Sequence, residues 1–296
     1  MRNSTFFWTK VFCFCLFLSC KTENVDEPSI DTLKIESEHV KFLNQIDLTV
    51  KNNMLVFASR EDYEKTLDYL GPLQSIDFME WDKELNFYSL RSIKTEEELE
   101  AIGIYDDLLA TLLNPDHLIA IENNIYKIDV LNDRVEVISD TQFKNVKSFS
   151  SKSGKISLFS TEDDVLDLIE NGQPSIDRGY CSSRKVSRNY NLSGLGIESK
   201  IVYQRGGIFK SLIAKIKKNG SGGYISHEST PGAKNKWQNK KDSRDISNYS
   251  NGGNKRKYSY RPYNRTRRLK SFKFDMTYTA EFGGSSSAYK LYISCN

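Results

Sequence analysis

The chain has 296 residues, of which 38% are hydrophobic and 12% aromatic, which is enough for a packed core and excludes a chain disordered throughout. The formal net charge of +3 hides a strong division along the chain. Residues 21–179 carry 16 Lys and Arg against 33 Asp and Glu, whereas residues 180–296 carry 24 against 6. This shift predicts an acidic domain at 49–175 and a basic domain at 180–296, whose opposite charges attract each other.

The first twenty residues have the layout of a secretory signal. Two basic residues precede or border an apolar run at 11–18, which is too short to cross a membrane because a spanning helix needs about 20 residues. The Leu-Ser-Cys sequence at 18–20 resembles a lipobox, in which the cysteine is lipidated and the peptide before it is removed. We therefore expect a signal peptide at 1–19, and a lipidated Cys20 with a polar tether at 20–48. The alternative is an ordinary signal peptide with an incidental cysteine.

Lipidation of Cys20 would tie a folded domain to a bilayer, because each buried methylene contributes about 0.8 kcal/mol and several acyl chains make a stable anchor. Lys21 stands where an Asp would resemble an inner-membrane retention signal, and a mainly acidic stretch follows. This stretch resembles the export signal of surface lipoproteins in the Bacteroidetes, and the alternative is a plain solvated linker. We expect a palmitate-carrying outer-membrane lipoprotein that faces the periplasm or lies on the cell surface, with no intracellular nucleic acid as partner.

Two cysteines remain in the part of the chain that is expected to fold, Cys181 and Cys295. They bracket the basic half, and an oxidising exterior favours their pairing. A disulfide would close a loop of about 115 residues, which the chain-entropy argument converts to roughly 4–5 kcal/mol of stabilisation. The alternative is two buried free thiols.

Apolar periodicity, capping residues and turn residues predict the elements of the acidic half. Together they indicate a small α/β domain that contains a β-meander. In chain order we expect one helical turn or short strand near 40–43, a strand at 54–57, a helix from Ser59 to Gly71, a helix from Thr95 with Glu98 in the capping-box position, a helix over 105–113, strands at 118–121, 125–130 and 135–138 joined by Asn-containing turns, and a helix capped by Ser160 or Thr161 and ended by Gly172.

The basic half has little helical periodicity. Its clearest strand is 269–281, where apolar and polar residues alternate with a period of two, as in a half-buried strand. We interpret residues 219–263 as extended loops. The fold class predicted for the chain is therefore α+β, with an acidic α/β domain followed by a basic antiparallel all-β domain that is sandwich-like or barrel-like. The other strand candidates are 199–204, 209–217 and 288–295.

Some of these segments resemble a known family. Met-Leu-Val-Phe at 54–57 followed by Ser-Arg-Glu-Asp-Tyr at 59–63 resembles a pattern of uncharacterised Bacteroidetes lipoproteins. Leu-Leu-Asn at 112–114, followed by a hairpin with Tyr-Lys-Ile at 126–128, resembles the same pattern. The resemblance covers about residues 52–170 and implies a strand–helix unit and a hairpin. It implies no activity beyond a speculative adhesion label and carries over no catalytic residue.

Sequence motifs for catalysis are weak. His227 is followed by Glu as in a zinc-protease helix, but a proline stands where the second histidine belongs, so we interpret His227 as an exposed loop residue. Residues 206–211 end like a phosphate loop, but Phe209 replaces the required glycine, so we expect a turn that enters a strand. Acid pairs at 106–107 and 163–164 lie at helix starts, where they complement the helix dipole. We therefore predict no cofactor, no metal site and no enzyme, with an unrecognised hydrolase as the least favoured alternative.

The feature that suggests binding is a run of cations and tyrosines at 255–270. Guanidinium groups suit phosphate, sulfate or carboxylate, and aromatic faces suit bases or sugar rings. We predict a binding or adhesion protein that recognises an anionic glycan, a polyanion or a protein partner. The alternative is a structural or interaction lipoprotein whose acidic half neutralises the basic one. The predicted binding residues are Lys257, Tyr258, Tyr260, Arg261, Tyr263, Arg265, Arg267 and Arg268.

Overall fold

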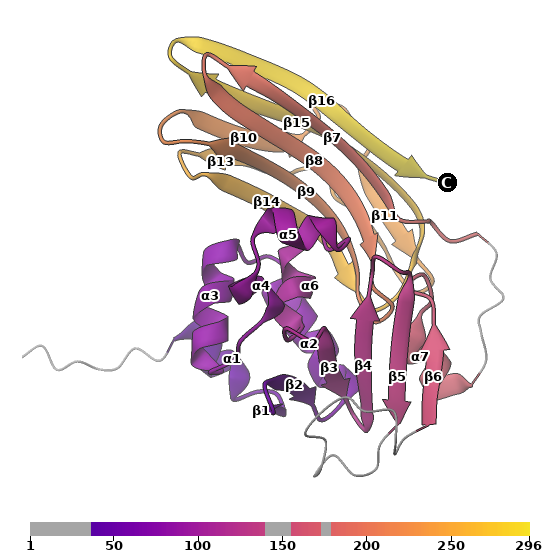
Figure 1. The fold of residues 1–296 in the computed structure, drawn as a ribbon. Coiled ribbons are helices and arrows are strands. Elements are labelled where there is room, and N and C mark those ends of the chain that lie inside the picture. Colours follow the sequence, from indigo (N-terminus) through magenta and orange to yellow (C-terminus); the bar gives the residue numbers. More distant parts are fainter. Residues whose placement is uncertain (1–36, 140–154, 173–178) are drawn as a thin grey trace, which may run out of the picture. The chain divides into compact units, whose positions relative to one another are not determined.

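The computed structural model describes residues 37–139, 155–172 and 179–296 (Figure 1). The signal segment, Cys20 and most of the tether lie outside the described residues. Residues 37–296 form one compact unit. The predicted boundary between an acidic and a basic domain falls inside this unit and stays a prediction.

The N-terminal half is a mixed α/β structure built on a six-stranded sheet with the order β1-β2-β3-β4-β5-β6. The β2–β3 pair is parallel and every other neighbouring pair is antiparallel, so β3 to β5 form the predicted meander and β6 extends it. The elements are α1 (Glu38–Leu43), β1 (Leu48–Lys51), β2 (Met54–Phe57), α2 (Arg60–Leu70), α3 (Ser75–Glu84), α4 (Leu90–Ile93), α5 (Glu96–Ala101), α6 (Asp107–Leu112), β3 (Leu118–Ile121), β4 (Asn124–Asp129), β5 (Arg134–Ser139), β6 (Lys155–Phe159) and α7 (Val165–Asn171).

Capping residues explain where several helices begin and end. The Ser59 hydroxyl accepts a hydrogen bond from the Asp62 backbone N–H at 3.1 Å, which opens α2. Thr95 and Glu98 form the predicted capping box at the start of α5. Gly172 ends α7 with a φ of 67°, a left-handed conformation that glycine adopts without steric cost.

Other local predictions were wrong. The N-cap of α7 is Asp164, not Ser160 or Thr161. The turn between β3 and β4 places Glu122, not an asparagine, at positive φ. Helices α3 and α4 and strand β6 were not predicted, because these short segments lack a long apolar period.

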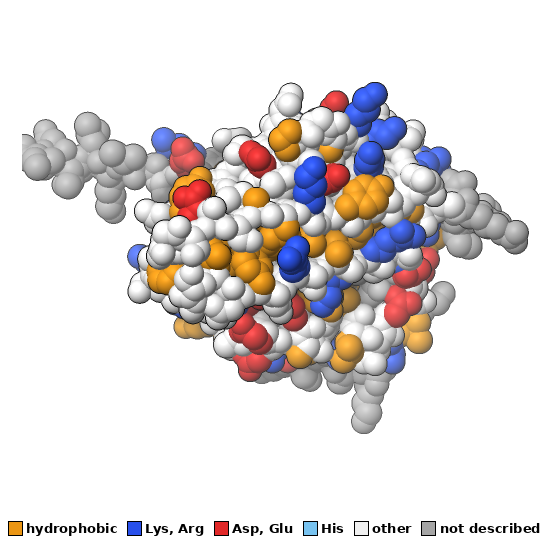
Figure 2. Space-filling view, turned by 90° about the horizontal axis from the view of Figure 1, so that it is seen from above, with side chains coloured by type: hydrophobic (Ala, Val, Ile, Leu, Met, Phe, Trp, Pro, Cys, Tyr) orange, Lys and Arg blue, Asp and Glu red, His pale blue; other side chains and the backbone are white. Residues whose placement is uncertain are grey.

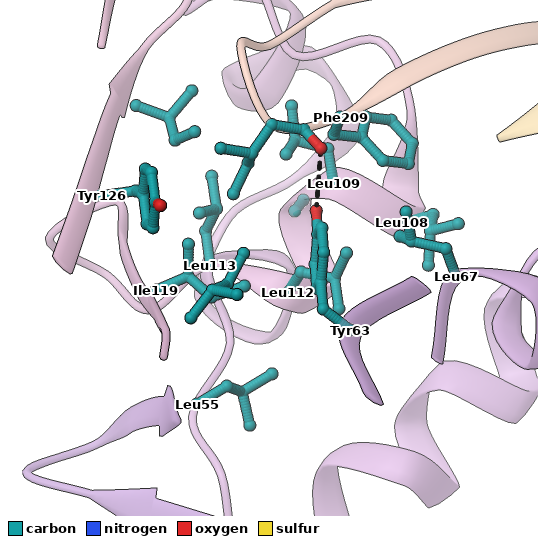
Figure 3. Close-up of a cluster of buried hydrophobic side chains, with 14 of the residues drawn as sticks. Leu55, Tyr63, Leu67, Leu108, Leu109, Leu112, Leu113, Ile119, Tyr126 and Phe209 are labelled. Atoms are coloured by element: carbon teal, nitrogen blue, oxygen red, sulfur yellow. Dashed lines mark hydrogen bonds between the residues drawn. The ribbon is translucent and has the colours of Figure 1, made fainter. Parts of the chain in front are cut away.

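The hydrophobic core of the N-terminal half lies between its helices and one face of its sheet. Figure 3 shows Tyr63 of α2, the leucines of α6 and Ile119 of β3 in one buried cluster with Phe209, which comes from the C-terminal half. Most of these side chains are fully buried, and burying a residue of this size stabilises the fold by about 1.5–3 kcal/mol. The first hydrophobic core therefore includes residues from both halves of the sequence.

The C-terminal half consists of two sheets. One has the order β14-β9-β8-β7, and the other has the order β12-β11-β15-β10-β13 with β16 also paired to β15. All these pairs are antiparallel, and residues of both sheets share a second hydrophobic core. The strands are β7 (Arg184–Leu192), β8 (Leu195–Arg205), β9 (Lys210–Asn219), β10 (Tyr224–Ser229), β11 (Lys236–Asn239), β12 (Ser243–Asp245), β13 (Ser250–Gly253), β14 (Lys257–Arg265), β15 (Leu269–Phe282) and β16 (Ser285–Cys295).

The expected α+β class is confirmed, with an antiparallel C-terminal half. Both C-terminal sheets are open over the described residues, so the form is sandwich-like, and the barrel-like form is not found there. The prediction of extended loops at 219–263 was wrong, because strands β10 to β14 lie in this stretch. Strand β7 was not predicted because most of its side chains are polar and exposed.

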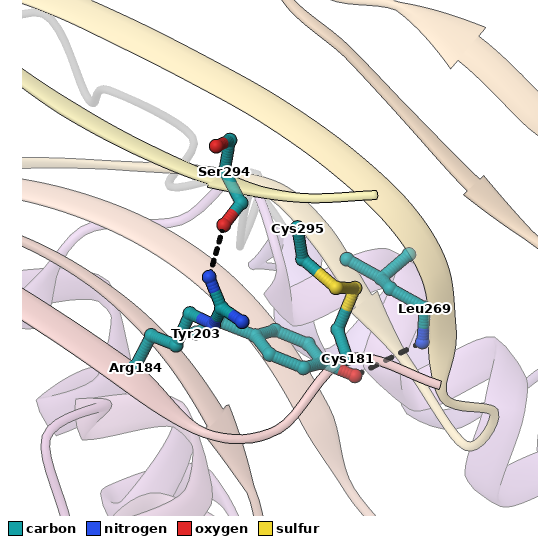
Figure 4. The surroundings of a disulfide bond; sticks show 6 residues. All are labelled: Cys181, Arg184, Tyr203, Leu269, Ser294 and Cys295. Carbon is teal, nitrogen blue, oxygen red and sulfur yellow. Dashed lines mark hydrogen bonds between the residues drawn. A yellow bond between two sulfur atoms is a disulfide. The ribbon is translucent and has the colours of Figure 1, made fainter. Parts of the chain in front are cut away.

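A disulfide joins the beginning and the end of the C-terminal half. The sulfurs of Cys181 and Cys295 are 2.11 Å apart and the two Cα atoms 5.8 Å apart (Figure 4). Beside it, the Leu269 N–H donates to the Tyr203 hydroxyl at 2.9 Å, and Arg184 donates to the Ser294 carbonyl oxygen at 2.5 Å. The bridge thus fixes the chain just before β7 to the last residue of β16.

Candidate functional site

Most of the predicted binding cations face carboxylates of the N-terminal half. Tyr258 and Tyr263 are buried in the second core. The predicted residues therefore do not form one exposed basic surface. On the face that it presents, Figure 2 shows Lys and Arg side chains interspersed with Asp, Glu and uncharged side chains. The pairs are Lys257 with Asp107, Arg261 with Asp106, Arg265 with Asp68, Arg267 with Asp167, and Arg268 with Asp164.

The centre of these contacts is an ion-paired face, which we define by Lys215 and Lys257 of the β14-β9-β8-β7 sheet and by Asp107 and Glu96 of the helices. The Asp107 carboxylate lies 2.5 Å from the Lys215 Nζ and 2.7 Å from the Lys257 Nζ, and Glu96 lies 3.3 Å from both. Burial opposes ionisation of Asp107, but the two ammonium groups outweigh it and hold its pKa well below the usual range. Asp107 is therefore charged in the folded protein.

Arg261 makes a second buried contact between the halves. Its side chain is 1% exposed, and its Nε donates to the Asp106 carboxylate at 2.6 Å. Its Nη1 donates to the Leu73 carbonyl oxygen at 2.9 Å, and its guanidinium lies 5.2 Å from the centre of the Phe78 ring. The Arg261 side chain is therefore buried with partners inside the protein and is not available to a ligand.

The acid pairs at 106–107 and 163–164 lie at helix starts, as predicted, but they do more than complement helix dipoles. Asp106, Asp107 and Asp164 are also the partners of basic side chains from the C-terminal half. No local sequence pattern indicates these pairs, because the partners are about a hundred residues apart or more.

The turn between β8 and β9 inserts into the first core, and we call residues 206–209 the apolar plug. Ile208 and Phe209 are fully buried there, and the Tyr63 hydroxyl donates to the Ile208 carbonyl oxygen at 3.4 Å (Figure 3). The Gly207 N–H donates to the Thr161 carbonyl oxygen at 2.8 Å. The segment is therefore a turn that enters a strand, as predicted, and not a phosphate loop.

Lys210 follows the apolar plug and points into the protein. Its Nζ donates to the Asp163 carbonyl oxygen at 2.5 Å and lies 3.4 Å from the Asp164 carboxylate. Burial is the largest influence on this ammonium and lowers its pKa to about 8. Lys210 thus serves a contact inside the fold and is not placed to hold a phosphate.

The surface feature that brings predicted binding residues together is a cavity of about 430 Å³, bordered by the end of α2 and by β12, β13 and β14. Tyr249 and Tyr260 lie in it with their rings stacked, the ring centres 3.5 Å apart and the planes 5° from parallel. Both are half-buried. We call this cavity the tyrosine groove, and the residues of it that matter below are Asp68, Arg244, Tyr249, Asn251, Tyr260 and Arg265.

His227 contacts Tyr249 of the tyrosine groove. It was predicted to be an exposed loop residue, but it lies on β10 and is fully buried. Its Nε2 is 3.0 Å from the Tyr249 hydroxyl oxygen, and the two rings meet edge to face. Burial lowers the pKa of His227 to about 3, so the ring is neutral near pH 7. His227 therefore fixes Tyr249 without adding charge.

The three arginines that line the tyrosine groove differ in whether a carboxylate pairs with them. Arg265 is paired with Asp68 and also donates to the Asn264 carbonyl oxygen. Arg261 also borders the groove, but its guanidinium is turned inward to Asp106. Arg244 is exposed on the edge strand β12 and makes no ion pair with any residue that the structure describes. One unpaired guanidinium therefore lies beside the stacked tyrosines.

A second cavity, of about 490 Å³, lies where the β4–β5 turn meets the ends of β7 and β8. In it Arg205 pairs with Glu162, and the Lys185 Nζ lies 4.5 Å from the centre of the Tyr105 ring. None of the predicted binding residues lines this cavity, so we place the candidate site in the tyrosine groove.

Within residues 37–139, 155–172 and 179–296, no three His, Cys, Asp or Glu side chains gather in a way that could hold a metal ion. No helix there combines the length and apolar character that a membrane crossing requires.

Comparisons with known proteins give one structural likeness. No family model matches the chain, and no curated protein matches it. The crystal structure of a DUF4848 family protein from Bacteroides thetaiotaomicron is similar, with a TM-score of 0.21 and 11% identity. The likeness covers 83% of this chain and 100% of that one. At this TM-score it carries no functional argument.

Proposed function

We propose that the chain is a membrane-anchored bacterial lipoprotein without enzymatic activity that binds a ligand through its basic β-rich half. The observation that supports the binding role is the tyrosine groove, where Tyr260 and Arg265 of the predicted set lie beside Tyr249 and Arg244. Aromatic rings next to a guanidinium suit a glycan or another anionic ligand. The ligand classes remain those expected from the sequence, namely an anionic glycan, a polyanion or a protein partner.

The proposal also includes where the protein resides. Cys20 carries the lipid, and the protein resides in the outer membrane, facing the periplasm or the cell surface. The family is proposed too: the strand–helix unit at 54–70 and the hairpin at 118–129 support a relation to the uncharacterised Bacteroidetes lipoproteins that the sequence resembles.

A second candidate function is a structural or interaction lipoprotein whose halves neutralise each other. The ion-paired face favours it, because Asp107 of the acidic half binds Lys257, a predicted binding residue, together with Lys215. The two candidates differ at the tyrosine groove. Ligand binding there is required by the first and absent from the second.

A hydrolase is the least supported alternative. Among the residues that line the tyrosine groove, all of them described, Asp68 is the one carboxylate, and it is paired with Arg265. Hydrolysis of a glycosidic bond generally uses two carboxylates on opposite sides of the bond. The groove therefore suits binding better than bond cleavage.

Binding should be tested with the full chain in detergent on immobilised acidic glycans, neutral glycans and DNA. The isolated 180–296 fragment is unsuitable, because it would expose Lys215 and Lys257 and retain any polyanion. We expect Tyr249→Leu, which removes the ring but keeps an apolar side chain, to lower retention at least tenfold. Tyr224→Leu is the matched control, since Tyr224 is 39% exposed and lies outside the tyrosine groove.

Two results would count against the proposed function. If the wild-type chain is retained on none of these ligands, the binding role is wrong and the structural role stands. If Tyr249→Leu and Tyr224→Leu lower retention equally, the groove is not the binding site.

The proposed location should be tested by cell fractionation and by protease treatment of intact cells. The wild-type chain should remain with the outer membrane, and Cys20→Ala should be released from it. If Cys20→Ala still fractionates with membranes, the lipid anchor is wrong. Cleavage of the wild-type chain on intact cells indicates surface display, and protection indicates the periplasmic side.

A further inference from the structure

We propose that the ligand of the tyrosine groove is a short acidic sugar, one or two residues long, whose ring packs on the tyrosines and whose carboxylate or sulfate pairs with Arg244. This inference rests on the proposed function, because it takes the groove as the binding site. It narrows the ligand from three broad classes to one.

The aromatic part of the argument concerns Tyr249 and Tyr260. A pyranose ring carries C–H bonds on its faces and hydroxyl groups around its edge, so it packs an apolar face against an aromatic ring while its hydroxyls form hydrogen bonds. The stacked pair provides such a surface, and the Tyr260 hydroxyl adds a polar group, since the Tyr249 hydroxyl already meets His227. Asn251, half-buried in the same groove, bonds the Tyr249 side chain, and its amide can both donate and accept. These groups suit a sugar better than an apolar ligand.

The electrostatic part concerns Arg244. A guanidinium offers donors in a planar fork that matches a carboxylate or a sulfate, and such charge-assisted pairs are about twice as strong as neutral hydrogen bonds. Arg261 and Arg265 already have carboxylate partners, whereas Arg244 has none among the described residues. The guanidinium of Arg244 can therefore pair with one negative charge on the ligand.

The size of the site argues against a long polyanion. A cavity of about 430 Å³ lies at the small end of the range for small-molecule sites. Affinity for DNA and similar polymers rises with the number of charges that the protein neutralises, and one unpaired guanidinium neutralises few. A short sugar with a single charge thus fits both the volume and the charge.

The tyrosine groove is also rigid before any ligand arrives. Tyr249 is held by His227 at 3.0 Å and by the stacked Tyr260, and Tyr260 in turn lies next to Phe274 of the second core. Groups that are fixed in advance lose little conformational freedom on binding. Because buried His227 stays neutral, this support does not change across the pH range of a bacterial exterior.

Calorimetric titration of the full chain in detergent tests the inference. The probes are digalacturonic acid, neutral galactobiose and a sulfated disaccharide derived from heparin. We expect an acidic probe to bind at least tenfold more tightly than galactobiose. Arg244→Ala should remove that preference, and Arg244→Lys should restore it in part. Arg256→Ala is the matched control, because Arg256 is exposed and does not line the groove.

The outcomes separate this inference from the proposed function. If galactobiose binds as tightly as both acidic probes, or if Arg244→Ala and Arg256→Ala have equal effects, the acidic-sugar inference is overturned while a binding role stands. If no probe binds, the inference is overturned, and the retention experiment on glycans and DNA decides the proposed function. The carboxylated and sulfated probes show which anion the groove prefers. Unchanged thermal unfolding of Arg244→Ala would show that the variant is folded.

Discussion

Two chemically different contacts join the N-terminal and C-terminal halves. The apolar plug buries Ile208 and Phe209 in the first core, where the gain follows the apolar area removed from water. The ion-paired face instead buries Lys215 and Asp107, whose mutual attraction mainly offsets the cost of removing both charges from water. Many of the opposite charges of the two halves therefore meet inside the molecule. Of the two contacts, the apolar plug contributes more to the free energy of unfolding, and the ion-paired face lowers that free energy mainly when one charged partner is removed.

The largest effect should come from the apolar plug. Phe209→Ala should lower the free energy of unfolding by about 3–5 kcal/mol, because it leaves a cavity in a packed core. Urea unfolding at low and at high salt measures this loss, which should be the same in both. Leu158→Ala, at a side chain that is 60% exposed, should change stability by less than about 0.5 kcal/mol. A loss at Phe209 that disappears in high salt would contradict the apolar assignment.

The ion-paired face should respond to the loss of one charge. Asp107→Asn should cost about 3 kcal/mol, because Lys215 and Lys257 would be left near each other without their main counter-charge. Adding Lys215→Met to Asp107→Asn should recover part of the loss in urea unfolding. Asp116→Asn, on an exposed carboxylate, is the control. If the double variant is no more stable than Asp107→Asn, the cost is not an unpaired buried charge.

Acid should weaken the ion-paired face. Burial favours the neutral form of Glu96, but Lys215 and Lys257 outweigh it and lower its pKa to about 2. A carboxylate with a lowered folded pKa contributes stability above its unfolded pKa of about 4.5. That contribution should be lost as the pH falls from about 5 to about 2, by on the order of 2 kcal/mol. Unfolding measured across this range should depend less on pH in Glu96→Gln, and an unchanged slope would refute the assignment.

Lys210, which follows the apolar plug, should make stability depend on pH in the alkaline range. The folded pKa of Lys210 is about 8, below its ordinary 10.5, so the unfolded chain holds the proton more tightly. Stability should therefore rise as the pH increases from about 8 to 10.5, by on the order of 1–2 kcal/mol. Comparison of wild type with Lys210→Met isolates this rise from other alkaline titrations. A wild-type profile parallel to that of Lys210→Met would exclude Lys210 as the source.

The smallest effect should come from the exposed rim of the ion-paired face. Lys217 lies 2.8 Å from Glu97, whose side chain is 73% exposed. Lys217→Ala should cost no more than about 1 kcal/mol, and salt should remove most of that cost. A loss as large as that of Asp107→Asn would mean that the rim and the centre of this face do not differ.

Local signals in the sequence predicted much of the regular structure. Ser59 and Thr95 marked helix starts because a capping hydroxyl acts on its own next turn. The alternation at 269–281 marked β15 because one of its faces is buried. Strands β10 to β14 were missed because the stretch 219–263 around them is rich in Gly, Ser, Asn and Lys, and because pairing with β15, β9 and each other holds them in place.

The candidate site was predictable only in part. Tyr260 and Arg265 were predicted from their position in a basic, tyrosine-containing run. Arg244 and His227 were not, because their roles depend on which strands pair and which faces are covered. The attraction between the halves followed from net charge, but the Asp107–Lys215 pair, 108 residues apart, could not be read from a single sequence.

Asp107 also has a consequence for strand alignment. It binds Lys215 from β9 and Lys257 from β14, two neighbouring strands whose register places Lys257 opposite Lys217. A slip of one residue turns every side chain of a strand to the opposite face of its sheet. After such a slip, Lys257 would point into the second hydrophobic core and Asp107 would lose a partner. A cluster that adds little net stability therefore discriminates the correct strand register from its neighbours during folding.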